Sequence, residues 1–157
     1  MKLSCEKVKS MLDVALLSPI ATRDAIKELA ITLRNENYSF LCVHSLHTKL
    51  AADVLQGSPV KVVSCVSFPQ GCITTRMKCL ETEQAVKDGA GEIDMVMHLG
   101  ALMEGDFKAV EDDIKSVVKT AGNLPVKVII ETPYLSMQQK IDASRIIQNA
   151  EIGRAHV

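Results

Sequence analysis

The chain has 157 residues, the usual length of one domain, and is long enough to bury a core. Hydrophobic residues make up 47% and charged residues 24%, and the formal net charge is -1, so we expect neither nucleic acid nor a membrane as a partner. No apolar run approaches the ~20 residues of a membrane span, and 5 cysteines without a Cys-x-x-Cys pair favour a reducing compartment. We therefore expect a cytoplasmic protein.

The N-terminal third predicts two strand–helix units after a short helix. Residues 12–17 (LDVALL) form an apolar, strand-like stretch, and Thr22 is a suitable N-cap for the helix that follows it. Residues 40–45 (FLCVHS) are rich in β-forming residues, and a helical stretch over residues 48–56 ends at Gly57. The apolar face of the helix that follows Thr22 consists of Ile26, Leu29, Ala30 and Leu33.

Two further strand–helix units follow. Residues 60–68 (VKVVSCVSF) predict a strand, and residues 76–88 predict a helix with Gly89 at its C-terminal end. Residues 92–100 (EIDMVMHLG) predict the next strand, and apolar residues at helical spacing come after it. This apolar stripe consists of Phe107, Val110, Ile114, Val117, Val118 and Ala121.

The last predicted unit begins with residues 126–132 (VKVIIET), which form a strand-like run. Ser136 and Gln139 have the spacing of a capping box, so a helix is expected from there to about Asn149. Alternation of strands and helices predicts an α/β fold with a parallel sheet, either doubly wound or closed into a barrel.

Charged residues inside two predicted strands favour the barrel. Side chains at alternate strand positions share a face, so Asp94 lies opposite the apolar face that contains Met95. Lys127 and Glu131 likewise share the face opposite Val128. A doubly wound sheet covers both faces with helices, whereas the mouth of a barrel can hold a polar cluster. We therefore predict a barrel of parallel strands and not a doubly wound sheet, with five βα units in this sequence.

Four stretches closely resemble motifs of the deoxyribose-phosphate aldolase family. Residues 66–107 contain its Phe-Pro-x-Gly turn and its Gly-Ala-x-Glu-Ile-Asp-Met-Val strand, and residues 126–132 resemble its Lys-Val-Ile-Ile-Glu-Thr strand. LDVALLSP (12–19) is similar to its Ile-Asp-His-Thr-Leu-Leu-Lys-Pro, and LCVHS (41–45) to its Val-Cys-Val-Asn-Pro. The resemblance covers about residues 11–150. It implies an incomplete TIM (β/α)₈ barrel, of which about the first five βα units are present.

The resemblance implies a reaction and a set of site residues. Members of this family are (β/α)₈ barrels that cleave 2-deoxyribose 5-phosphate to glyceraldehyde 3-phosphate and acetaldehyde through a lysine Schiff base, without a metal or other cofactor. Asp94 matches the family's catalytic aspartate, which moves protons together with a water and a nearby lysine. Lys127, Asp13 and Cys42 match substrate-pocket residues, the cysteine being unnecessary for the chemistry. The parent protein is expected to be a homodimer or homotetramer.

The motif that carries the Schiff-base lysine is absent from this sequence. In the family a Gly-Ala-Asp-Phe-x-Lys-Thr-Ser segment follows the helix that is predicted here to end near Asn149, whereas this chain continues with EIGRAHV. A common sequencing-adaptor end, GAG-ATC-GGA-AGA-GCA-CAC-GTC, encodes this same heptapeptide. We therefore expect residues 1–150 to be the N-terminal part of a single barrel, residues 151–157 to be a non-native tail, and the chain alone to be inactive.

Other interpretations of the same residues stay open. Lys127 could be the nucleophile of another class I aldolase, although a nucleophilic lysine needs a lowered pKa and nearby carboxylates act in the opposite direction. Lys127 and Glu131 could form a purely structural pair, and Asp13 could be a turn residue. His44 and His47 suggest a metal site, but no third ligand has a suitable spacing. The chain could also be a non-catalytic barrel fragment that self-associates through an open sheet edge.

The opening motif departs from the family pattern. Val14, Ala15 and Ser18 replace the family's His, Thr and Lys, and His44 with Ser45 replaces Asn-Pro. These changes leave the finer substrate preference open.

Overall fold

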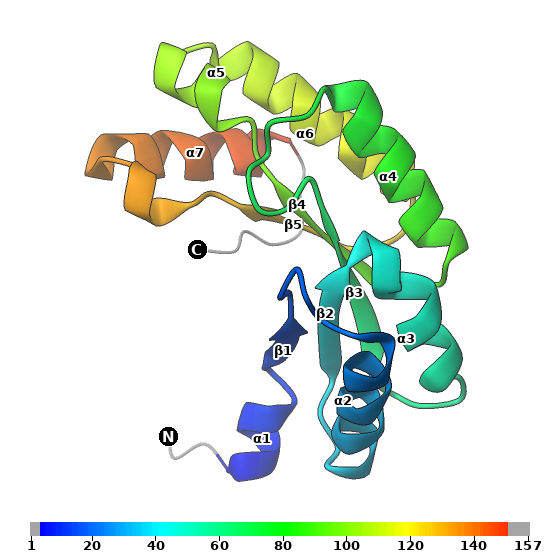
Figure 1. Cartoon of the computed structure of the whole chain (residues 1–157). Helices are drawn as coiled ribbons and strands as arrows, with labels where there is room; N and C mark the ends of the chain where they lie inside the picture. Colours follow the sequence, from blue (N-terminus) through cyan, green and yellow to red (C-terminus); the bar gives the residue numbers. More distant parts are fainter. Residues whose placement is uncertain (1–3, 151–157) are drawn as a thin grey trace. The chain divides into compact units, whose positions relative to one another are not determined.

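A computed structural model describes residues 4–150 of the chain (Figure 1). Five strands form one sheet in which hydrogen-bonded neighbours follow the order β1-β2-β3-β4-β5. The strands are β1 (Asp13–Leu16), β2 (Phe40–His44), β3 (Lys61–Val66), β4 (Glu92–Val96) and β5 (Val126–Ile129). The pairs β1–β2 and β4–β5 are parallel, as the alternation of strands and helices predicts. The described residues belong to two compact units, the first comprising residues up to 64 with 85–92 and the second 65–84 with residues from 93 onward.

The first unit packs helices against β2. Its helical segments are α1 (Cys5–Lys9), α2 (Arg23–Asn35), the 3-10 turn η1 (Ser45–His47) and α3 (Thr48–Val54). Thr22 caps α2, its hydroxyl accepting a hydrogen bond from the Ala25 N–H at 3.2 Å, as predicted. The buried core of this unit consists of Ile26, Ala30, Leu33, Leu41, Val43, Ala51, Leu55, Val60 and Val62.

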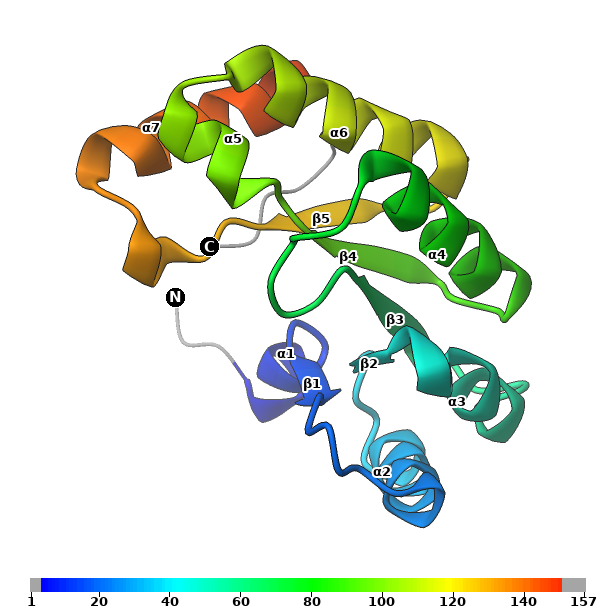
Figure 2. The ribbon, with the colours of Figure 1, turned by 45° about the horizontal axis from the view of Figure 1, so that its top comes forward.

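The second unit surrounds β4 and β5. Its helical segments are most of α4 (Thr75–Lys87), whose last three residues belong to the first unit, α5 (Leu99–Glu104), α6 (Phe107–Ala121), the 3-10 turn η2 (Thr132–Tyr134) and α7 (Met137–Asn149). Figure 2 shows α4, α5 and α6 on the same side of β4 and β5, and α6 packs against β5, α5 and α7. The predicted capping box begins α7, because Ser136 and Gln139 each accept a hydrogen bond from the other's backbone N–H.

Strand β4 is shorter than predicted. It ends at Val96, whereas the sequence predicts a strand to residue 100. His98 instead caps α5, a helix that the sequence pattern does not predict, since its Nδ1 accepts a hydrogen bond from the Ala101 N–H at 3.1 Å. The alternation of Met97 and Leu99 with polar neighbours resembles a strand, but it also suits a strand-to-helix turn.

Strand β5 also ends early. It stops at Ile129, and Glu131 adopts a left-handed backbone conformation with φ 53° before η2 begins. Glu131 therefore lies beyond the strand, on a loop at its carboxyl end.

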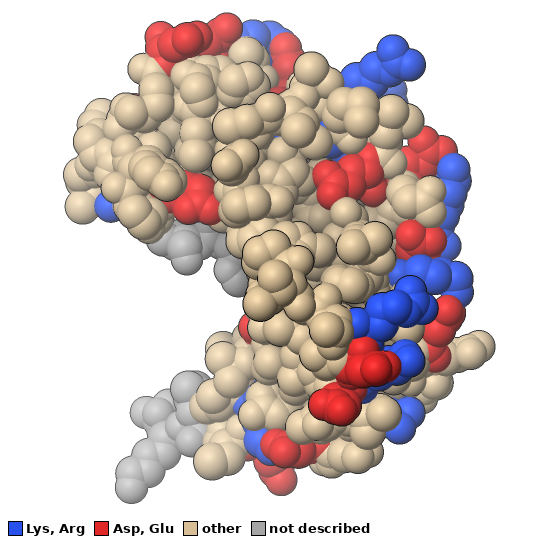
Figure 3. All heavy atoms as spheres, in the orientation of Figure 1, with Lys and Arg blue, Asp and Glu red and all other residues tan. Residues whose placement is uncertain are grey.

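The outer surface carries charges of both signs. On the face drawn in Figure 3, Lys and Arg side chains lie among Asp and Glu side chains. Between residues 4 and 150, no helix has both the length and the apolar character needed to cross a membrane.

Candidate active site

Asp94 and Lys127 form a buried ion pair across two neighbouring strands. The register of β4 and β5 places Asp94 directly opposite Lys127, and Lys127 Nζ lies 3.2 Å from Asp94 Oδ1. Only 6% of Asp94 and 2% of Lys127 is exposed. The positive charge of Lys127 favours the ionised form of Asp94, which offsets part of the cost of burying a carboxylate.

Backbone hydrogen bonds between β4 and β5 hold the two strands together before and after Asp94. The Ile93 N–H donates to the Pro125 carbonyl at 3.0 Å, and the Met97 N–H donates to the Ile129 carbonyl at 3.2 Å. Ile93 and Met95, which alternate with Asp94, are fully buried among apolar residues. Because strand side chains alternate, this apolar packing directs Asp94 to the other face of the sheet, as the sequence predicts.

The turn after β3 approaches the end of β4 very closely. Gly71 has φ +67°, and its N–H donates to the Ser67 carbonyl at 2.8 Å. A Cβ atom at Gly71 would lie 2.3 Å from the Met97 carbonyl oxygen and 3.0 Å from the Val96 side chain. Glycine is therefore required here by both the backbone conformation and the lack of space.

We expect Gly71→Ala to lower the free energy of unfolding by about 2–4 kcal/mol, because the methyl group adds a backbone clash to the cost of the left-handed conformation. Chemical denaturation of the chain measures this change. Gly105→Ala is the matched control, since Gly105 has φ +77° and nothing lies within 4 Å of its Cβ position. Gly105→Ala should cost only about 1–2 kcal/mol, the conformational part alone. Equal losses for the two variants would contradict the close approach at Met97.

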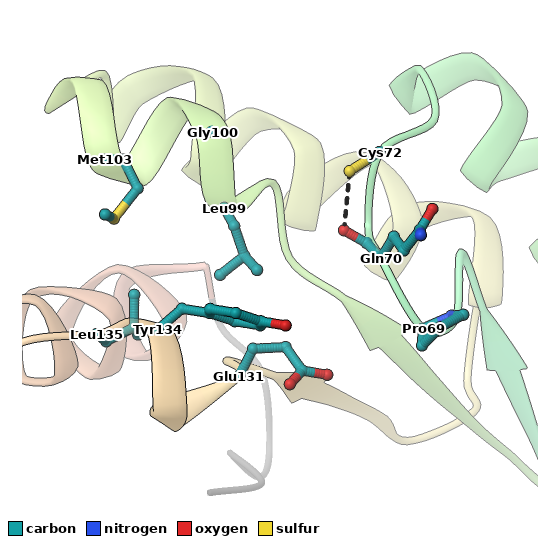
Figure 4. Close-up of a pocket in the computed structure, with 9 residues that line it drawn as sticks. All are labelled: Pro69, Gln70, Cys72, Leu99, Gly100, Met103, Glu131, Tyr134 and Leu135. Carbon is teal, nitrogen blue, oxygen red and sulfur yellow. Dashed lines mark hydrogen bonds between the residues drawn. The ribbon is translucent and has the colours of Figure 1, made fainter.

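A cavity of about 680 Å³ opens at the loops that follow β3, β4 and β5 (Figure 4). Figure 4 shows Leu99 of α5 and Tyr134 of η2 directed toward each other, with the Glu131 carboxylate beside the tyrosine ring. The complete lining is Pro69, Gln70, Cys72, Leu99, Gly100, Met103, Glu131, Tyr134 and Leu135. Carboxyl ends of parallel strands form the catalytic face of (β/α)₈ barrels, so this cavity lies on the expected side.

The two remaining predicted pocket residues lie in the first unit. Asp13 begins β1 and is partly buried, and Cys42 is a buried residue of β2 with 4% exposure. The register pairs Asp13 with Phe40 and Ala15 with Cys42, so Asp13 and Cys42 share one face of the β1–β2 pair.

One of the two histidines considered as metal ligands contacts the backbone. His44 Nε2 lies 2.9 Å from the Leu17 carbonyl oxygen, which suits a hydrogen bond from the ring N–H. Over residues 4–150, no group of three or more His, Cys, Asp or Glu side chains is arranged to hold a metal ion.

A second buried ion pair in the same unit, between Lys78 of α4 and Asp113 of α6, is not among the residues predicted from the sequence. The one available signal is that Asp113 directly precedes Ile114 in the apolar stripe of α6, which places a carboxylate at the edge of a buried face.

Comparisons with known proteins show the family of the chain. The model of the DeoC/LacD family aldolases matches residues 45–156. The chain belongs to the DeoC/LacD aldolase family. A deoxyribose-phosphate aldolase from Staphylococcus haemolyticus is 43% identical over 139 residues, which cover 88% of this chain and 63% of that protein. One from Thermotoga maritima is 44% identical over 138 residues, covering 88% of this chain and 56% of the relative.

Solved structures of aldolases have the same fold. The tetrameric deoxyribose-phosphate aldolase of Aeropyrum pernix superposes with a TM-score of 0.90 at 25% identity, covering 97% of this chain and 64% of that one. QR15, an aldolase, gives a TM-score of 0.91 at 30% identity, with 94% and 66% covered. The predicted incomplete (β/α)₈ barrel is thereby confirmed. This member of the DeoC/LacD family spans less than two thirds of the length of these relatives.

Proposed function

We propose that this chain contains the proton-transfer residues of a deoxyribose-phosphate aldolase active site, Asp94 and its partner Lys127. The reaction is the reversible cleavage of 2-deoxyribose 5-phosphate to glyceraldehyde 3-phosphate and acetaldehyde through a lysine Schiff base. The observation that carries the proposal is the buried pair in which Lys127 Nζ lies 3.2 Å from Asp94 Oδ1 on adjacent parallel strands. Membership in the DeoC/LacD family and identities above 40% to deoxyribose-phosphate aldolases support the choice of reaction.

Asp94 acts as the proton shuttle. When a lysine amine adds to the C1 aldehyde, the carbinolamine must gain a proton on oxygen and lose water before the iminium forms. A carboxylate can accept and return this proton, directly or through one water, only from within hydrogen-bonding reach. Asp94 is buried on β4, which limits the movement of its side chain. The positive charge of Lys127 stabilises the ionised form of Asp94.

Lys127 serves as the cationic partner of Asp94 and not as the nucleophile. Nucleophilic attack requires the neutral amine, whereas an anionic carboxylate at 3.2 Å favours the ammonium form. We propose that the Schiff-base lysine belongs to the family's Gly-Ala-Asp-Phe-x-Lys-Thr-Ser segment, which residues 1–157 do not contain. Asp13 and Cys42 are proposed to line the substrate pocket, and the protein is proposed to be a cytoplasmic homodimer or homotetramer that requires no cofactor.

An extended form of the chain tests this function. We define it as residues 1–150 joined to the part of the Staphylococcus haemolyticus relative that follows its matched segment. The extended form is expected to cleave 2-deoxyribose 5-phosphate, measured as released glyceraldehyde 3-phosphate, while the 157-residue chain is expected to release none above background. A folded extended form without cleavage activity would contradict the proposed substrate. Cleavage by the 157-residue chain would contradict the proposal that the Schiff-base lysine is not among its residues.

A further inference from the structure

Helix α4 buries polar side chains and exposes apolar ones. Lys78 and Thr82 are fully buried on its inner side, whereas Met77 is 51% and Leu80 47% exposed. A helix that packs on a sheet ordinarily does the opposite. The polar inner face of α4 therefore has a use other than filling the core.

Lys78 uses its ammonium group to hold the end of strand β4. Its Nζ donates to the carbonyl oxygen of Val96, the last residue of β4, at 2.9 Å. The same Nζ forms an ion pair with Asp113 Oδ2 at 2.6 Å, and the Thr75 hydroxyl donates to Asp113 Oδ1 at 2.7 Å. Lys78 thus connects α4, α6 and β4 at one buried point.

Glu81, one helical turn further along α4, makes a corresponding contact with the end of β3. Its carboxylate accepts a hydrogen bond from the Ser67 N–H at 2.8 Å. Ser67 follows the last residue of β3 and has φ +58°, a conformation that costs energy for any residue with a Cβ atom. One face of α4 therefore holds the carboxyl ends of two neighbouring strands.

Stability alone explains the Lys78–Asp113 pair poorly. Removing two charges from water costs about as much as their attraction returns, and apolar residues of similar volume often stabilise a protein as well or better. What an apolar replacement lacks is the donor for the Val96 carbonyl. Val96 is two residues after Asp94 on the same strand, β4.

We propose that Lys78 is a positioning residue for the aldolase site: by fixing the carboxyl end of β4 through Val96, it sets the place of the Asp94 carboxylate relative to Lys127. This inference rests on the proposed function for its catalytic consequence, but its structural part is independent of that function. Lys78 acts through the backbone of β4, by its hydrogen bond to the Val96 carbonyl.

Three variants separate positioning from stability. Lys78→Met removes both the ion pair and the donor to Val96, and Asp113→Asn removes the ion pair but keeps the donor. The double variant Lys78→Met/Asp113→Leu replaces the pair with apolar side chains and lacks the donor. Lys108→Met is the matched control, because Lys108 pairs with Asp112 on the exposed side of α6.

The first readout is hydrogen–deuterium exchange of residues 92–98 in the 157-residue chain, compared at equal distance below each variant's melting temperature. We expect about 10-fold faster exchange at the end of β4 in both variants that lack the Lys78 donor, and no change in Asp113→Asn or Lys108→Met. The double variant should recover most of the stability that Lys78→Met loses. Should Asp113→Asn open the end of β4 as much as Lys78→Met does, or should neither open it, the proposal is overturned.

The second readout is steady-state kinetics of the extended form. Since a displacement of about 1 Å in a catalytic group can cost 100-fold, we expect the double variant to lose about 10- to 100-fold in kcat with little change in KM. Recovery of both stability and kcat in the double variant would reduce Lys78 to a structural residue. If the unsubstituted extended form is itself inactive, the proposed function fails, and hydrogen–deuterium exchange alone decides the role of Lys78.

Discussion

Replacing Asp94 with asparagine in the extended form is expected to lower kcat by about 10²- to 10⁴-fold, the usual contribution of a positioned general acid–base group. Asparagine keeps nearly the same shape and can still accept a hydrogen bond from Lys127, but it cannot take up and return a proton. The ion pair at 3.2 Å shows that the side chain is held in place, so the loss reflects missing chemistry more than altered position. Steady-state assay of 2-deoxyribose 5-phosphate cleavage measures it.

Asp112→Asn provides the control for this prediction. Asp112 lies on the exposed side of α6, where it pairs with Lys108, and surface pairs of this kind contribute little. Its kcat should stay within about twofold of the unsubstituted enzyme. If the kcat of Asp94→Asn also stayed within about twofold of the unsubstituted enzyme, Asp94 would not be the proton-transfer residue.

Lys127→Met is expected to lower the free energy of unfolding of the 157-residue chain by about 3–5 kcal/mol, because it leaves a buried carboxylate without its neutralising cation. Both side chains of the pair are less than a tenth exposed, so bulk water solvates the remaining carboxylate poorly. Urea denaturation followed by circular dichroism gives the change. Lys108→Met, on an exposed ion pair, should cost less than about 1 kcal/mol.

The double variant Asp94→Leu/Lys127→Met tests whether Asp94 and Lys127 stabilise the protein as an ion pair or separately by packing. Removing both charges together should restore most of the stability, since an apolar pair of similar volume is often as stable as a buried ion pair. Additive losses from the two substitutions would instead show that each side chain stabilises the protein independently of the other.

Local patterns in the sequence predict much of the fold. Thr22, Ser136 and the apolar face of α2 each specify a helix through contacts within a few residues, and the structure confirms them. The opposite placement of Asp94 and Met95 follows from strand alternation in the same way. The catalytic role of Asp94 and the pocket roles of Lys127, Asp13 and Cys42 stay predictions.

Sequence patterns fail where one local pattern fits two structures, or where residues distant in the sequence decide the structure. Met97 and Leu99 fit either a strand or a turn into a helix, and the structure has the turn, with His98 as the helix cap. Lys78 and Asp113 are 35 residues apart on different helices, so no local periodicity connects them. A buried lysine is recognisable only when the fold brings its carboxylate partner to it.

Borohydride reduction in the presence of 2-deoxyribose 5-phosphate, followed by mass spectrometry of the peptides, tests the proposed site most directly. We expect a substrate adduct in the extended form alone, on a lysine of the added segment, and no adduct on any lysine of the 157-residue chain. An adduct on Lys127 that disappears in Lys127→Met would contradict the proposal and make Lys127 the nucleophile.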